Sequence, residues 1–168
     1  MAQDETTGPA PNGNGTAAPT GPAQLIINAQ YVRDLSFENP RAPQSLLQQK
    51  AQPEVSLDVD VKARNLAPEL FEVSLTISAQ AKAEGETAFI VQLTYCGVVT
   101  IKNASQEIIA GMILVETPRL LFPFARNVIA TATRDGGFPP LLINPIDFSE
   151  LLRREQAKAQ AAAQTATA

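Results

Sequence analysis

The stretch of sequence that decides the fold runs from Glu54 to Gln80 and is EVSLDVDVKARNLAPELFEVSLTISAQ. Apolar side chains alternate there with polar ones in two blocks, 54–62 and 71–80. Because successive side chains of a strand point to opposite faces, this period of two predicts two half-buried strands. The break at 65–68 between the blocks makes the two strands antiparallel neighbours.

Two further strands are expected beside this pair. The sequence Glu84-Gly85-Glu86 favours a hairpin turn, and residues 89–96 beyond it alternate again, with a second face that is partly apolar. A shorter strand is predicted over 25–33, where neither face is cleanly polar. The partly apolar second faces indicate that another subunit or a ligand covers the sheet there.

The period changes to a helical one after Ile101. Residues 108–113 predict a short helix, and Thr117-Pro118 predicts the start of a second helix, with Thr117 as N-cap. Gly136-Gly137 should end it. Asn144 is expected to cap a last helix, whose apolar face comprises Phe148, Leu151 and Leu152.

Strands followed by helices predict an α+β domain, with a four-stranded antiparallel sheet and helices packed on one of its faces. The Gly- and Pro-rich residues 1–22 are expected to be a disordered tail. Residues 23–155 form the predicted domain, and 156–168 are an Ala/Gln tract that should fray. The chain of 168 residues can support one such domain, and we expect a homo-oligomer.

Composition excludes several kinds of site. The chain has no histidine and one cysteine, Cys96, so it offers no catalytic triad, no structural zinc site and no internal disulfide. A net charge of -4 argues against nucleic acid as a partner, because that affinity comes from lysine and arginine. There is no phosphate-binding glycine loop and no run of some 18 apolar residues. Because the lone cysteine fits a reducing compartment, we expect a cytoplasmic protein, without membrane insertion or a metal site.

One pair of carboxylates could support catalysis. Asp58 and Asp60 lie two residues apart on a predicted strand, so their side chains would project from one face about 7 Å apart, as in an acid/base pair. Such pairs usually belong to the solvated face of a strand. Arg33, Asp34 and Glu38 surround Phe37 just after the first predicted strand, where they form a charged rim around an exposed aromatic ring.

The segments between these elements carry a resemblance to a known family. Residues 31–40 with Ala42-Pro43, then 53–59, 121–126 and 137–148, resemble in order and spacing the bacterial protein-export chaperone family SecB. The resemblance covers about residues 25–155. It implies a sheet with helices on one side, assembled as a homotetramer that is a dimer of dimers.

The resemblance also implies a function. It implies an ATP-independent holdase that keeps unfolded precursor proteins competent for translocation and passes them to the motor ATPase SecA. The residues that match the family's client-binding groove are Val55, Leu57, Val59, Phe148 and Leu152. Those that match its SecA-binding surface are Asp34, Glu38, Ile90 and Gln92. Two positions depart from the family pattern, since Gln92 replaces a common glutamate and Ala51 a common aromatic.

Two alternatives remain open at this point. One is a small α+β enzyme of the isomerase or hydrolase type that uses Asp58 and Asp60. The other is a purely structural homo-oligomer.

Overall fold

The structure, a computed structural model, describes residues 21–47 and 53–165. A four-stranded antiparallel sheet has the order β1-β4-β3-β2. Its strands are β1 (Gln24–Glu38), β2 (Glu54–Ala67), β3 (Leu70–Ala83) and β4 (Glu86–Lys102). The helices are α1 (Gln44–Leu47), α2 (Gln106–Gly111), the π-helical turn η1 (Met112–Glu116), α3 (Thr117–Asp135) and α4 (Phe148–Thr165). The predicted α+β fold class is confirmed for this chain, and Ala51 lies outside the described residues.

The strands follow the predicted alternation, and the turn between β3 and β4 is the predicted one. Glu84 and Gly85 both have positive φ, at 54° and 81°, as a two-residue hairpin turn requires. The register places Val59 opposite Ile77 and Asp58 opposite Ser78. Along this part of β2 and β3, apolar residues therefore share one face of the sheet and polar residues the other.

Strand β1 is longer than the predicted 25–33, because it continues to Glu38. Two register shifts, after Ile27 and after Val32, exchange the faces to which its side chains point. Val32 and Phe37 thus share the apolar face with Tyr95 and Val91. These bulges explain why neither face of this strand is cleanly polar in the sequence.

The predicted break before Thr117 was wrong. Residues 106–135 form one continuous helix through α2, η1 and α3, and the Thr117 hydroxyl donates to the Met112 carbonyl at 2.8 Å. Pro118 has no N–H to donate, and its ring would crowd the carbonyl four residues earlier. The wider π turn relieves that contact without ending the helix.

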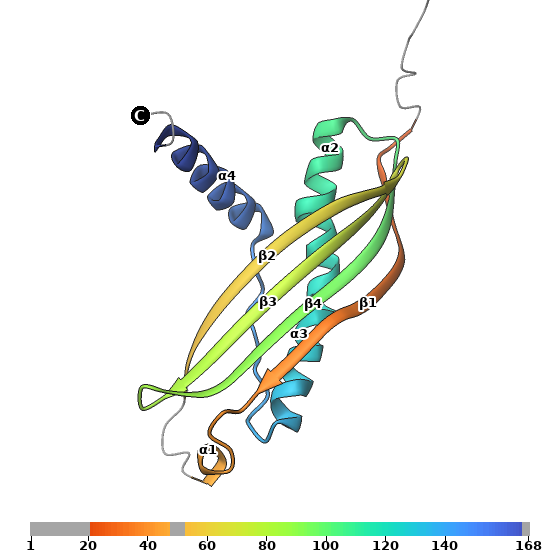
Figure 1. Cartoon of the computed structure of the whole chain (residues 1–168). Helices are drawn as coiled ribbons and strands as arrows, with labels where there is room; N and C mark the ends of the chain where they lie inside the picture. Colours follow the sequence, from red (N-terminus) through yellow and green to blue (C-terminus); the bar gives the residue numbers. More distant parts are fainter. Residues whose placement is uncertain (1–20, 48–52, 166–168) are drawn as a thin grey trace, which may run out of the picture.

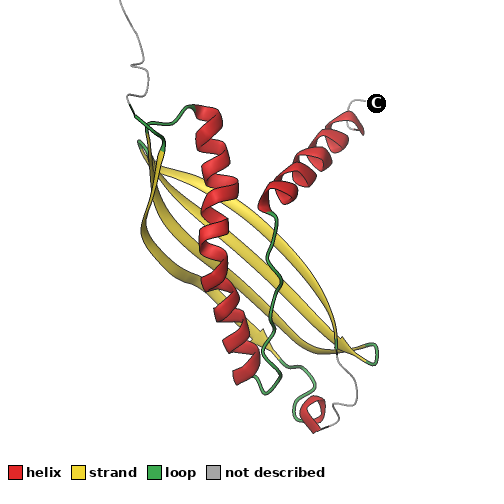
Figure 2. Ribbon diagram, turned by 180° about the vertical axis from the view of Figure 1, so that it is seen from behind, coloured by secondary structure: helices red, strands yellow, loops and turns green. Residues whose placement is uncertain are grey.

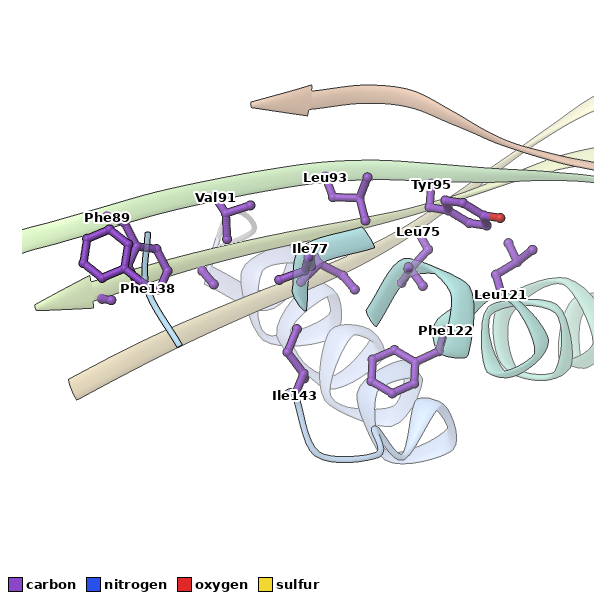
Figure 3. Packing of buried hydrophobic residues seen from close by; sticks show 14 of the residues in the cluster. Leu75, Ile77, Phe89, Val91, Leu93, Tyr95, Leu121, Phe122, Phe138 and Ile143 are labelled. Carbon is purple, nitrogen blue, oxygen red and sulfur yellow. The ribbon is translucent and has the colours of Figure 1, made fainter. Parts of the chain in front are cut away.

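This long helix crosses one face of the sheet and leaves the other face uncovered (Figures 1 and 2). It packs tightly at Gly97 of β4, where a Cβ atom would stand 2.9 Å from a Leu121 methyl group. Residues 106–135 are long and apolar enough to cross a membrane, a property shared by helices in the core of soluble proteins. Figure 3 shows Leu121 and Phe122 directed at Leu75, Ile77 and their neighbours in the core.

The last helix also begins later than predicted. Asp147, not Asn144, caps α4, because its Oδ1 accepts hydrogen bonds from the backbone N–H groups of Ser149 and Glu150 at 2.9 and 3.0 Å. These bonds hold the pKa of Asp147 below its usual value. The helix continues to Thr165, past the limit of 155 expected for the domain.

Candidate functional site

A cleft of about 670 Å³ opens at the end of the sheet where β3 turns into β4. We call it the hairpin cleft. The sheet contributes Val55 and Phe89 to its lining, and the connection between α3 and α4 contributes Phe138, Leu141 and Leu142. Polar residues also line it, among them Arg41, Ser45 and Glu86. A cleft with large apolar side chains and a few polar groups in its lining suits an apolar peptide side chain.

Phe89 and Phe138, which line this cleft, pack with a third aromatic ring, Phe37. Phe89 lies 4.9 Å from Phe138 and 5.7 Å from Phe37, measured between ring centroids. The prediction that Phe37 is exposed inside a charged rim was wrong, because the ring packs against the core while Asp34 and Glu38 point to the opposite face. Phe37 also leaves no room at Gly136, where a Cβ atom would overlap it.

The structure separates the five residues proposed for the client groove. Val55 lines the hairpin cleft and Leu57 follows on the same face of β2, with 41% and 42% of their surfaces exposed. Val59 and Leu152 are half-buried. Phe148 is 1% exposed and packs 6.1 Å from the Phe122 ring, so its side chain is part of the core in this conformation.

The four residues proposed for the SecA surface come together on the uncovered face. Glu38 lies opposite Ile90, Ser36 opposite Gln92 and Asp34 opposite Thr94. Asp58 and Asp60 share this face from the far edge, on β2. We call the half of the uncovered face that carries Asp34, Glu38, Asp58 and Asp60 the acidic end.

Asp58 and Asp60 lie on an open surface rather than in a pocket suited to catalysis. Asp58 borders a shallow hollow of about 360 Å³ that also includes Ser78, Ile90 and Gln92. The Asp60 carboxylate forms an ion pair with Lys62 at 3.0 Å. No group of three potential metal ligands occurs among residues 21–47 and 53–165. Nothing in this geometry favours the enzyme alternative.

Sequence reasoning missed a charged cluster farther along the same face. Glu72 of β3 is 3% exposed, and its Oε2 atom accepts from Arg33 and Arg64, each at 2.5 Å. The Tyr31 hydroxyl donates to the other carboxylate oxygen. We call these four residues the Glu72 cluster. The hydrogen bond from Arg64, with those from Tyr31 and Arg33, lowers the pKa of Glu72 from 4.5 to about 2 although burial opposes the shift.

Only the tertiary structure could reveal this cluster, because its members come from three strands. Glu72 occupies an ordinary polar position in the alternation, and Arg33 and Tyr31 reach it from β1 across the intervening strand β4, with Arg33 at a β-bulge. The floor of the hairpin cleft was also missed, although Phe138 and Pro139 belong to the segment that carried the resemblance.

Comparison with known proteins identifies the family. The model of the preprotein translocase subunit SecB matches residues 18–159. The chain belongs to the SecB family. The protein-export protein SecB of Bradyrhizobium diazoefficiens is 48% identical over 152 residues, covering 90% of this chain and 94% of its own. The corresponding protein of Rhodospirillum centenum is 47% identical over 153 residues, covering 90% and 91%.

A solved structure supports the same fold. A SecB-like chaperone of Mycobacterium tuberculosis, in complex with a ChAD peptide from an antitoxin, aligns with a TM-score of 0.62. The match covers 73% of this chain and 90% of the other at 12% identity. At that identity the likeness shows the fold alone.

Proposed function

We propose that this SecB-family protein is an ATP-independent holdase that binds unfolded precursor proteins at the hairpin cleft and along the neighbouring part of β2. The observation that carries this proposal is the set of apolar side chains that the chain leaves exposed in and beside the hairpin cleft. Val55 and Leu57 continue the cleft along β2, and Leu142 on the opposite wall is 65% exposed. Exposed apolar surface of this kind favours binding of another polypeptide.

Such a surface suits many clients with unrelated sequences. The cleft accepts one large apolar side chain, and the β2 surface offers shallower contacts to its neighbours. Several weak contacts along one unfolded chain raise the overall affinity without any single tight site. Because the holdase binds the unfolded state, mass action alone delays folding of the client. No nucleotide or cofactor is required.

We further propose that the acidic end binds SecA, which receives the client. Asp34 and Glu38 are exposed beside Ile90 and Gln92 on a flat sheet surface. Carboxylates in this arrangement attract a basic segment, giving fast and salt-sensitive encounter. The client surface and the acidic end lie on opposite faces of the sheet, so one subunit could hold both partners.

The proposed cytoplasmic holdase acts as a homotetramer. Ile108, Leu120 and Phe124 of the long helix are exposed in the single chain, and copies of the chain would cover them. We propose that the tetramer brings several client surfaces onto one particle.

The first test measures spontaneous refolding of a slow-folding precursor protein, with no nucleotide present. We expect arrest at stoichiometric concentration, with a native mass of about four subunits. Leu57→Ser should raise the concentration needed for arrest about fivefold to tenfold. Leu66→Ser is the matched control, because Leu66 is 43% exposed on the same strand but lies far from the cleft. An equal effect of both variants, or unimpeded refolding, would contradict the proposed client surface.

The second test separates the two surfaces. Asp34→Lys and Glu38→Lys should weaken SecA binding and leave refolding arrest unchanged, since both residues point away from the cleft. Equal loss of both activities would rule out two independent surfaces.

A further inference from the structure

The uncovered face of the sheet has two halves of opposite charge. The acidic end carries Asp34, Glu38, Asp58 and Asp60. The adjoining half, which we call the cationic half, carries Arg33, Lys62 and Arg64 around the buried Glu72. The two halves meet on β2, where Lys62 follows Asp60 and pairs with it at 3.0 Å. Figure 1 looks onto this face and shows no helix over it.

Glu72 holds two arginines in place but leaves the cationic half positively charged. Both guanidinium groups donate to the same carboxylate oxygen, Oε2, through Nη2 of Arg33 and Nε of Arg64. One carboxylate thus serves two cations. Among the described residues no other carboxylate contacts either arginine. Their side chains are 43% and 68% exposed, so the remaining N–H groups can reach a partner.

Anchored arginines of this kind are suited to binding a carboxylate. A guanidinium group can donate two parallel hydrogen bonds to one carboxylate, and less side-chain entropy is lost when the group is already held. Arg64 donates its Nε–H group to Glu72, so both of its terminal nitrogens remain available for a partner. An all-basic segment that extended from the acidic end over this half would instead meet repulsion.

We infer that the cationic half binds an acidic side chain of the same partner segment whose basic residues dock on the acidic end. This inference rests on the proposed function of the acidic end. Asp60 and Arg64 are four residues apart on β2, which corresponds to about 13 Å of extended chain. The partner segment should therefore carry its acidic residue about four positions from its basic ones. The uncovered face then selects both the composition of the segment and its direction.

The test uses two synthetic peptides that differ only in their acidic residues. Each has three lysines, a spacer of three glycine and serine residues, and a final pair that is either two aspartates or two asparagines. We expect the aspartate peptide to bind the full-length protein about fivefold more tightly in low salt. Tighter binding of the aspartate peptide would be informative, because added negative charge should weaken binding to a chain of net charge -4 unless a cationic site binds that charge.

Variants of the arginines test whether these residues cause the preference for the aspartate peptide. Arg64→Gln should abolish the preference for aspartate while the asparagine peptide still binds. Arg64→Lys should retain part of it, because the charge remains without the planar fork. Arg153→Gln on α4 is the matched control, since it removes the same charge from an exposed arginine that forms an ion pair with Glu150, away from the uncovered face. Thermal unfolding and native mass identify any variant that fails to fold or assemble.

The outcomes distinguish failure of this inference from failure of the proposed acidic end. If wild type binds both peptides equally, or if the preference survives in Arg64→Gln and in Arg33→Gln, the inference is wrong and the proposed acidic end stands. If neither peptide binds wild type, the acidic end is not a docking surface for basic segments, and both proposals fall together.

Discussion

The two faces of the sheet come from the same four strands but obey different constraints. On the helix side, Leu75, Ile77 and Leu93 are fully buried, and the long helix approaches until Gly97 touches Leu121. On the uncovered side, charged residues occupy both edges, and the buried carboxylate of Glu72 is matched by two arginines and a tyrosine. Packing determines the first face, whereas charge pattern determines the second. Substitutions of buried residues on either face should therefore change stability, whereas substitutions of exposed residues, such as Leu57 on the helix side and Asp34 on the uncovered side, should mainly change binding.

The largest effect is expected at Phe148, which tests the boundary between core and client surface. Phe148→Ala removes a fully buried ring and should lower the free energy of unfolding by about 3–5 kcal/mol. Denaturant unfolding at fixed protein concentration measures this change in the free energy of unfolding. Leu152→Ala is the comparison, and because Leu152 is half-buried we expect about 1 kcal/mol. If Phe148→Ala unfolds like wild type yet binds clients poorly, Phe148 belongs to the client surface instead.

The next largest change in unfolding free energy is expected at Gly97, where the long helix packs against the sheet. Gly97→Ala places a methyl group against buried Leu121 and should cost about 1–3 kcal/mol of unfolding free energy. Gly111→Ala, in α2, is the control, because no atom lies within 4 Å of its added Cβ and the helix should become more stable by about 0.5–1 kcal/mol. Thermal unfolding compares the midpoints of the two variants with that of wild type. Equal midpoints would show that the sheet and helix are not in close contact at Gly97.

A smaller effect on stability is predicted for the buried carboxylate of Glu72 on the uncovered face. Because the pKa of Glu72 is lowered from 4.5 to about 2, its ionised form stabilises the fold fully above about pH 4.5. This contribution should be lost as the pH falls from 4.5 through 2. Thermal midpoints of wild type should thus decrease over that range more steeply than those of Glu72→Gln. Parallel pH profiles of the two proteins would contradict the ion pairs described here.

The smallest effect is expected for the carboxylate that borders the shallow hollow. Asp58→Asn removes an exposed charge, so the unfolding free energy should change by less than about 0.5 kcal/mol. Refolding arrest should remain unchanged, because Asp58 and the client surface point to opposite faces. Loss of arrest with an intact assembly would restore a functional role for Asp58 and Asp60.

Several features of the fold were accessible from local pattern. The alternation in 54–80 predicted β2 and β3, and Glu84-Gly85 predicted the turn, because both signals depend on neighbouring residues alone. The helix boundaries were less accessible. Proline at 118 indicates a start when a helix begins there, but a π turn lets the same residue lie inside a longer helix.

The residues of the candidate site likewise differ in whether the sequence could place them. Val55 and Leu57 could be proposed from the resemblance, and the structure leaves both exposed beside the cleft. Phe148 could not be placed, because the same apolar helical position serves a core or an open surface depending on what packs against it. The two bulges of β1 likewise decide which of its side chains lie on the uncovered face, and the mixed polarity of 25–33 does not fix their positions.

The sequence by itself determined the sheet, its order of elements, the absence of histidine chemistry and the SecB family, because these depend on periodicity, composition and ordered motifs. The tertiary structure alone decided which apolar residues remain exposed at the hairpin cleft. It also decided that Glu72 joins Arg33 and Arg64 from three strands. Such contacts depend on strand register and helix placement, which are set by packing between segments distant in the chain.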